Sequence, residues 1–241
     1  MQAFLDEMRR LGKQSPRVWL LGKEFVIHPD VFHPEISIDV KEFLTEKILK
    51  TMEEELMKKS EEASFDFLEV GCGAGYTAIL AALASPKCKA WAADISDVAV
   101  ENTIENAKLH GVEDRLTAVT ADVFDHKEIA GREFDMIYWD FPWFCQQTEP
   151  ETQLDMLMRS LVDPGYQAFR RYLAQAEKVL KKTGRIFVAF SFHLGSKELF
   201  ETVVKETGWS YKISSKKTFV VEIADEQQEL EVSVVELFKR E

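Results

Sequence analysis

Short apolar runs alternate with amphipathic segments through the middle of the chain. Five runs are continuous enough to be strands buried on both faces: 65–70, 89–94, 116–121, 134–139 and 185–192. Most are separated by segments whose apolar residues recur every three or four positions, which is the spacing of a helix face. This alternation is typical of a parallel sheet wound by crossover helices. The pattern therefore predicts a doubly wound α/β domain.

Capping residues mark where several of the intervening helices begin and end. Ser96 stands in an N-cap position, and the helix that it starts ends before Gly111. An Asp-Pro pair at 163–164 is a second start signal, and the apolar spacing after it predicts a helix that continues to Gly184. A shorter helix is predicted over 197–207. These segments supply the helical connections that a wound sheet requires.

Both ends of the chain depart from this alternation. Apolar residues spaced four apart predict a helix over 41–58, within an extension of residues 1–64 that we expect to pack on the core. At the other end, 219–223 and 230–238 are strand-like and are separated only by a short polar stretch. The pattern of the tail therefore predicts an antiparallel hairpin. We expect residues 65–241 to form the main domain.

Composition and charge narrow the class of protein. Of the 241 residues 46% are hydrophobic, which is enough to fill a sizeable core. No apolar run approaches the roughly 18 to 20 residues of a membrane-spanning helix, and the N-terminus lacks the basic-then-apolar order of a signal peptide. We therefore expect a cytoplasmic protein with no membrane partner. The net charge of −12 argues against a nucleic-acid partner.

The cysteines point to neither a disulfide framework nor a metal site. Cys72, Cys88 and Cys145 leave one thiol unpaired in any scheme, and none of them has the spacing of a metal-ligand pair. We expect reduced thiols and no bound metal.

A glycine-rich turn follows the first predicted strand. Gly71, Gly73 and Gly75 alternate with other residues directly after a strand that carries Glu69. Glycines at the carboxyl end of a strand in an open α/β sheet allow the backbone to approach a ligand closely. Dinucleotide-binding turns have a glycine in the sixth position, where this chain has Tyr76. The turn therefore favours a nucleotide-like ligand without a diphosphate.

Acidic residues end the next two predicted strands at the same edge of the sheet. Asp94 ends the second strand, where a carboxylate can accept hydrogen bonds from both hydroxyls of a ribose. Asp122 follows the third strand, where it can accept from an adenine amino group while Val123 lies against the ring. The turn and these residues together predict an adenosine-binding edge.

This arrangement resembles the class I S-adenosylmethionine-dependent methyltransferases. The resemblance rests on E-x-G-x-G-x-G at 69–75, an acidic residue at the next strand end, and a second one after the third strand. It implies a Rossmann-like, seven-stranded, mostly parallel sheet with a reversed last strand, and S-adenosyl-L-methionine as cofactor. By this resemblance the methionine moiety lies beside Glu69 and the glycines, the ribose beside Asp94, and the adenine beside Asp122 and Val123. The cofactor-binding residues that we predict are Glu69, Gly71, Cys72, Gly73, Gly75, Asp94, Ile95, Asp122 and Val123.

The fourth predicted strand ends in a second motif. Asp140, Phe141, Pro142 and Trp143 are similar to the [D/N/S]-P-P-[Y/F/W] motif of methyltransferases that modify planar nitrogens, among them the release-factor glutamine methyltransferases and the N6-adenine enzymes. A V-F-x-P segment at 31–34 resembles the small-domain group of the same class. The predicted catalytic residues are Asp140, Phe141, Pro142 and Trp143.

The chemistry explains why such a motif is needed. An amide or exocyclic amine is a poor nucleophile because its lone pair is delocalised. The Asp140 side chain and the Phe141 carbonyl can accept N–H groups, while Trp143 stacks on the planar group. The resemblance thus implies methyl transfer to an amine or amide nitrogen of a protein or small molecule.

The second motif position departs from the family, because Phe141 stands where the family has proline. That leaves open an oxygen, sulfur or carbon acceptor, and also a protein that uses the cofactor for chemistry other than methylation. A nicotinamide-dependent oxidoreductase is a further alternative, supported by the position of Asp94 and opposed by Tyr76. The segment 145–162, which is rich in glutamine and glutamate, does not indicate which molecule accepts the methyl group. The sequence also does not determine the oligomeric state.

Overall fold

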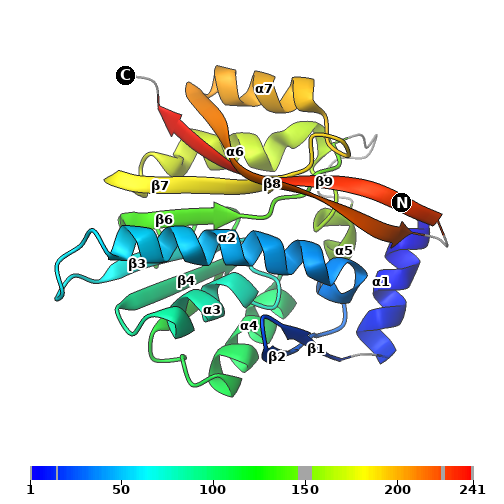
Figure 1. Cartoon of the computed structure of the whole chain (residues 1–241), viewed down its shortest axis with the longest axis horizontal. Helices are drawn as coiled ribbons and strands as arrows, with labels where there is room; N and C mark the ends of the chain where they lie inside the picture. The colour runs from blue at the N-terminus through cyan, green and yellow to red at the C-terminus, as the bar shows by residue number, and fades with distance from the viewer. Residues whose placement is uncertain (1, 15, 146–153, 224–225, 240–241) are drawn as a thin grey trace.

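Seven strands form the main sheet, and two short strands form a separate hairpin. The computed structural model describes residues 2–14, 16–145, 154–223 and 226–239. The strands of the main sheet are β3 (Phe65–Val70), β4 (Cys88–Asp94), β5 (Leu116–Thr120), β6 (Phe134–Trp139), β7 (Leu180–Phe190), β8 (Trp209–Ile223) and β9 (Glu226–Lys239). Their order across the sheet is β5-β4-β3-β6-β7-β9-β8 (Figure 1).

The first five strands of that order run parallel, and the last strand of the chain is reversed. β3 pairs in parallel with β4 and β6, β4 with β5, and β6 with β7. β9 lies between β7 and β8 and is antiparallel to both. The predicted doubly wound, mostly parallel sheet and its closing hairpin are therefore confirmed.

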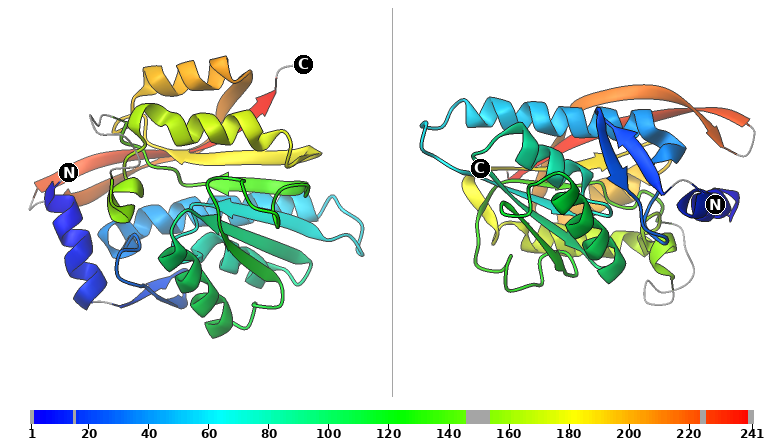
Figure 2. Two further views of the ribbon diagram at one scale, coloured as in Figure 1. Left: turned by 180° about the vertical axis from the view of Figure 1, so that it is seen from behind. Right: turned by 90° about the horizontal axis from the view of Figure 1, so that it is seen from below.

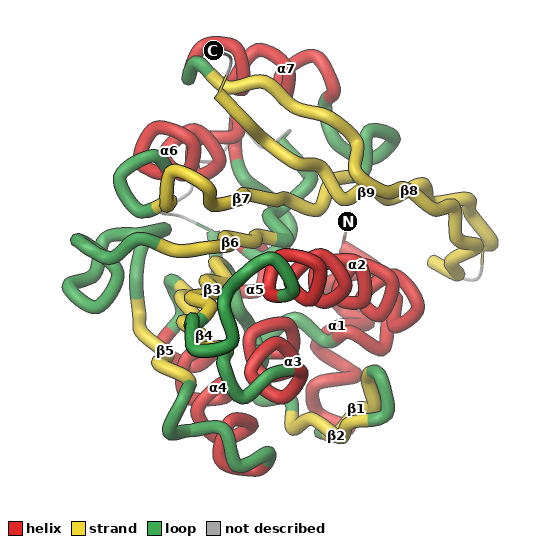
Figure 3. The backbone as a smooth tube through the Cα atoms, turned by 60° about the vertical axis from the view of Figure 1, so that its left-hand side comes forward, coloured by secondary structure: helices red, strands yellow, loops and turns green. Residues whose placement is uncertain are grey.

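Helices cover both faces of the sheet. The helices are α1 (Gln2–Gln14), α2 (Ile38–Leu56), α3 (Tyr76–Ala84), α4 (Asp97–Leu109), α5 (Met156–Arg159), α6 (Gln167–Ala176) and α7 (Lys197–Glu206), with 3-10 turns at Pro34–Ser37 and Pro164–Tyr166. One apolar core joins the sheet to α2, α3 and α4, and a second joins its other face to α6 and α7 (Figure 3). Alternate strand residues point to opposite faces of the sheet. Because helices cover both faces, both sides of the central strands are buried.

The helix predicted over 163–184 is wrong in its second half. α6 ends at Ala176, and β7 begins at Leu180, which pairs with Phe134 of β6. The ladder then shifts register, and a Cβ at Gly184 would lie only 2.7 Å from the carbonyl oxygen of Phe134. Gly184 is thus required by a close approach of two strands rather than by a helix end.

One hairpin is longer than the apolar pattern predicts, and a second hairpin was not predicted at all. β8 begins ten residues before the predicted 219–223, in a polar stretch that the pattern does not mark as a strand. The extension contains an unpredicted hairpin of β1 (Arg17–Leu20) and β2 (Lys23–Val26), in addition to its helices. Leu21 and Gly22 connect the two strands with φ of 50° and 72°, the tight turn that matches strand twist.

Residues of the predicted extension contact the rest of the chain through α2 and β2. α2 packs against α3 and β9. Two buried asparagines of α4 bind the backbone of β2: the side-chain oxygen of Asn106 accepts from the Val26 N–H at 2.8 Å, and both Asn102 and Asn106 donate to the Val26 carbonyl. Both views of Figure 2 place α1 at the end of the molecule to which the β8–β9 hairpin extends. None of the described helices is long and apolar enough to span a membrane.

Candidate active site

The glycine turn leaves β3 in a conformation that favours glycine. Gly71, Gly73 and Gly75 have φ of 61°, 57° and 80°, a region that costs other residues about 1 kcal/mol or more. A Cβ at Gly71 would lie 2.5 Å from the indole nitrogen of Trp139, and one at Gly75 would lie 2.7 Å from Thr103. The alternating glycines thus serve both the backbone path and close packing.

Glu69 lies buried behind this turn and holds the start of α3. Its carboxylate accepts a hydrogen bond from the Ala78 N–H at 2.8 Å. Burial raises the pKa of Glu69 to about 7, although hydrogen bonds from Ala78 and Thr77 act in the opposite direction. A carboxyl with this pKa is partly protonated at neutral pH.

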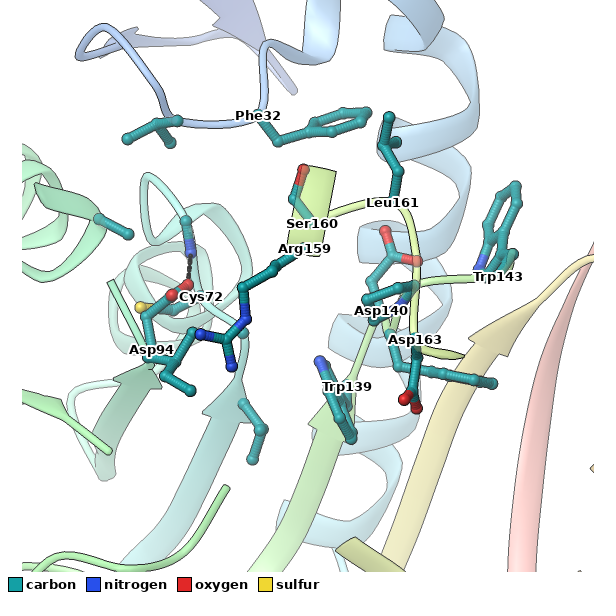
Figure 4. Close-up of a pocket in the computed structure, with 18 of the residues that line it drawn as sticks. Phe32, Cys72, Asp94, Trp139, Asp140, Trp143, Arg159, Ser160, Leu161 and Asp163 are labelled. Atoms are coloured by element: carbon teal, nitrogen blue, oxygen red, sulfur yellow. Dashed lines mark hydrogen bonds between the residues drawn. The ribbon is translucent and has the colours of Figure 1, made fainter. Parts of the chain in front are cut away.

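Asp94 ends β4 and faces the glycine turn. Its carboxylate accepts from the Gly73 N–H at 2.9 Å and from the Ser96 N–H at 3.0 Å (Figure 4). Burial raises its pKa, while those hydrogen bonds and the charge of Arg159 lower it. In Figure 4 the Arg159 side chain extends from α5 into the space between Asp94 and Trp139. Ile95 follows in the lining of the same space.

Cys72 is a packing residue of the turn. Its N–H donates to the Ala93 carbonyl at 3.0 Å, and its sulfur lies 3.3 Å from the hydroxyl of Thr103. Burial raises the pKa of the Cys72 thiol well above its ordinary value, so the thiol stays protonated. No group of three or more metal-binding side chains occurs among the described residues.

The third strand end differs from the second in exposure. Asp122 is largely exposed, and its carboxylate accepts from Arg171 of α6 at 3.1 Å. Val123 is buried with φ of 59°, a left-handed backbone that is costly for a β-branched residue. The surrounding structure holds Val123 in this strained conformation, in the wall of the cavity described below, and strained residues cluster at ligand sites.

The motif after β6 separates into a polar side chain and a packing side chain. Asp140 forms an ion pair with Lys41 of α2, and both side chains are mostly buried. Phe141 points into the core instead, stacked at 4.5 Å on Phe169 and at 5.4 Å on Phe190. The Phe141 side chain therefore has a structural role, and only its backbone is available to a ligand.

Trp143 is fixed by two hydrogen bonds. Its indole N–H donates to the Ala189 carbonyl at 3.1 Å, and its own carbonyl accepts from the Tyr166 hydroxyl at 2.7 Å. Figure 4 shows Trp143 beyond Asp140, on the side away from Asp94. A ring tied down in this way loses little further freedom when a planar group stacks on it.

One cavity of about 480 Å³ joins these elements, within the size range of ligand sites. It runs from the glycine turn past Asp94 and Asp140 to the inner side of the β8–β9 hairpin. Gly75 is the predicted site residue that does not line it, because this glycine packs against α4. The predicted residues that line the cavity are Glu69, Gly71, Cys72, Gly73, Asp94, Ile95, Asp122, Val123, Asp140, Phe141, Pro142 and Trp143.

The side chains of the cavity wall that sequence reasoning did not predict include Phe32, Lys41 and Arg159. Phe32 belongs to the V-F-x-P segment, which marked its neighbourhood but gave it no role. Lys41 and Arg159 are single charged residues on predicted helical or polar segments, where a solvent-exposed position is the default expectation.

Comparison with known proteins places the chain in a family. The methyltransferase domain family matches residues 61–231. A release factor glutamine methyltransferase of Aquifex aeolicus is 28% identical over 83% of this chain and 72% of its own length. A bifunctional methyltransferase of Rickettsia felis is 26% identical over 80% of this chain, which spans only 42% of that relative.

A solved structure agrees on the fold. The structure of SMU.776 complexed with SAH, the demethylated cofactor, aligns with a TM-score of 0.59 and 11% identity, over 92% of this chain and 56% of the other. The residues here fit such a cofactor, because the glycine turn, the Asp94 carboxylate and the cavity lie at the carboxyl ends of the strands. The chain belongs to the methyltransferase domain family, as a class I enzyme that uses S-adenosyl-L-methionine.

Proposed function

We propose that this enzyme transfers a methyl group to an amide or amine nitrogen of a protein or small molecule. The observation that carries the proposal is the shared cavity, which places the glycine turn and the polar end of the Asp140 motif in one continuous space. A donor held at one end and an acceptor held at the other then meet without leaving the cavity.

The residues at the glycine end are suited to hold the cofactor. In this proposal the backbone at Gly71 and Gly73 lies along the methionine moiety, Asp94 accepts from the ribose hydroxyls, and Asp122 with Val123 contacts the adenine. Bound S-adenosyl-L-methionine supplies an electrophilic methyl group on a positively charged sulfur. The remaining cofactor-binding residues of the proposal are Glu69, Cys72 and Ile95, while Gly75 supports the turn without lining the cavity.

The residues at the motif end are suited to hold a planar nitrogen. A carboxylate oxygen of Asp140 and the carbonyl of Phe141 accept its N–H groups, while Pro142 and the Trp143 ring confine the plane of the group. Such contacts pull the lone pair out of conjugation and aim it at the methyl carbon. Orientation of this kind is worth effective concentrations of about 10⁵ M or more.

The presence of Phe141 in place of the family's proline has a structural explanation. It therefore does not argue against a nitrogen atom as the methyl acceptor. The ring fills an aromatic cluster with Phe169, Phe190 and Phe200, so the residue at this position is chosen by the core. Its carbonyl remains in the motif whichever side chain is present. Relatives named release factor glutamine methyltransferases support an amide of a protein as the acceptor.

The test uses methyl-labelled cofactor with two matched peptides, one carrying an exposed glutamine and the other glutamate at the same position. We expect label in the glutamine peptide alone, and the demethylated cofactor in equal amount. Asp140→Ala should abolish turnover while affinity for the demethylated cofactor, which is neutral at sulfur, is retained. Asp125→Ala, which removes an exposed carboxylate outside the cavity, is the matched control.

Two outcomes would refute the proposal. Full turnover in Asp140→Ala would remove the motif from the reaction. Label that enters only oxygen, sulfur or carbon positions of a cell extract, identified by mass spectrometry of the product, would assign the enzyme to the alternative acceptor chemistry.

A further inference from the structure

A lysine of the N-terminal extension reaches the acceptor end of the cavity. Lys41 lies in the first turn of α2, and its ammonium group bonds one carboxylate oxygen of Asp140, 99 positions away in the sequence. The exposed fractions of the two side chains are 17% and 19%, so little water competes with the pair. The Phe32 ring lies on the ammonium as well, with its centroid 5.4 Å away.

Several other ionisable groups line the cavity with Asp140, among them Arg159, whose charge acts on Asp94. The Asp163 carboxylate accepts from the N–H groups of residues 168 and 169 in α6. Burial, with a smaller contribution from Asp140, raises the pKa of the Tyr138 phenol, which stays neutral. The buried Glu69 carboxyl lines the same cavity as the pair, and its pKa of about 7 is influenced by both Lys41 and Asp140. Lys41 bonds the Asp140 carboxylate directly.

We propose that Lys41 is a positioning residue of the reaction: it cancels the charge of Asp140 and occupies one oxygen, so that the other oxygen is turned to a neutral N–H donor. The inference rests on the proposed function. A bare carboxylate next to the transferred methyl group would bind the cationic cofactor more tightly than the neutral product, and would favour a cationic acceptor. With Lys41 in place, a protonated amine meets both the ammonium and the sulfonium, whereas an amide meets a neutral pair.

The test measures the charge near the sulfur through the ratio of two affinities. S-adenosylmethionine carries a positive sulfur and S-adenosylhomocysteine a neutral one, so calorimetric titration with each reports on that charge without any acceptor. Asp140→Asn leaves the ammonium unpaired and should lower the preference for the cationic cofactor about tenfold. Lys41→Met leaves the carboxylate unpaired and should raise that preference. The double variant, neutral at both positions, should return to within about threefold of the wild type.

Further variants separate charge from packing. Lys41→Arg keeps the charge and should keep the wild-type ratio. Lys47→Met removes a lysine of the same helix that does not line the cavity and should change nothing. With the glutamine peptide as acceptor, Lys41→Met should lower kcat about tenfold and the double variant should recover part of the loss.

The inference is overturned if both single variants keep the wild-type affinity ratio, or if the double variant stays at the ratio of Asp140→Asn. A merely structural lysine would lower the stability of the fold and leave the ratio unchanged. Failure to methylate any amide would count against the proposed function alone, because the affinity ratio is read in the absence of acceptor.

Discussion

The buried Glu69 carboxyl makes the stability of this fold depend on pH in a predictable direction. Its pKa rises on folding from an ordinary 4.5 to about 7, because burial penalises the charged form. A tenfold change in an acid dissociation constant is worth about 1.4 kcal/mol, so the rise corresponds to about 3 kcal/mol. The folded state holds the proton more tightly than the unfolded state does. The contribution of Glu69 is therefore fully present below pH 4.5, falls between 4.5 and 7, and is lost above about 7.

The perturbation that isolates this effect is Glu69→Gln. Glutamine keeps an oxygen to accept from the Ala78 N–H but cannot ionise. Urea unfolding of wild type and variant without cofactor, from pH 4.5 to 8, gives the free energy of unfolding of each. The difference between the two proteins should move by about 3 kcal/mol in favour of the variant as the pH rises.

The difference between the two proteins matters because other carboxyls also make the stability of each protein depend on pH, near and below the lower end of this range. Asp135, Glu55 and Glu236 have lowered pKa values from ion pairs, and they act with the opposite sign. Glu54→Gln, which changes an exposed glutamate of α2, is the control and should give a flat difference. A difference for Glu69→Gln that stays within about 1 kcal/mol over the whole range would refute the argument, because it would mean that the carboxylate is ionised at little cost.

Three further substitutions test the packing of the site. Gly71→Ala meets the Trp139 indole and a left-handed φ, so cofactor affinity measured by calorimetry should fall about tenfold or more. Asn106→Ala leaves the Val26 N–H of β2 unpaired and should lower the free energy of unfolding in urea by about 2 kcal/mol, whereas Glu101→Ala, at an exposed position of the same helix, should change it by less than about 0.5 kcal/mol. Phe141→Pro, which restores the family motif, should cost about 3 kcal/mol or more in the same assay, because it empties an aromatic cluster.

The control for the glycine substitution is Gly111→Ala. Gly111 has φ of 63° and nothing within 4 Å of its Cβ position, so it carries the backbone strain without a clash. It should lower the thermal midpoint and leave cofactor affinity unchanged. Equal loss of affinity in both variants would show that the Trp139 contact is irrelevant, and wild-type stability in Phe141→Pro would show that the aromatic cluster does not select Phe141.

The parallel core and the cofactor edge were predictable because their signals are local. A strand buried on both faces is a continuous apolar run, as in β3 and β6. The turn at Gly71 to Gly75 needs a left-handed backbone, and the glycines themselves indicate this in the sequence. Asp94 was placed correctly at a strand end for the same reason. Its bond to the Gly73 N–H then ties that strand end to the glycine turn.

Features that depend on distant partners were not predictable. The start of β7 depends on pairing with Phe134. The first ten residues of β8, which are largely polar, form a strand because β9 lies beside them. From the sequence alone Lys41 is expected to be an ordinary surface lysine, and only the fold places it beside Asp140. The Leu21-Gly22 turn was missed because leucine, unlike asparagine, gives no signal for a left-handed residue.

The motif at Asp140 to Trp143 shows how tertiary contacts can replace local ones. A proline at the second position would fix one backbone angle and remove an N–H. Here the Phe141 ring, stacked between α6 and β7, fixes the same turn from outside the motif, and Tyr166 bonds the Trp143 carbonyl. The Lys41 pair holds the Asp140 side chain in a similar way. The rigidity of the motif thus depends on three sets of contacts from outside it, so a substitution in any of them should lower turnover even where the demethylated cofactor still binds.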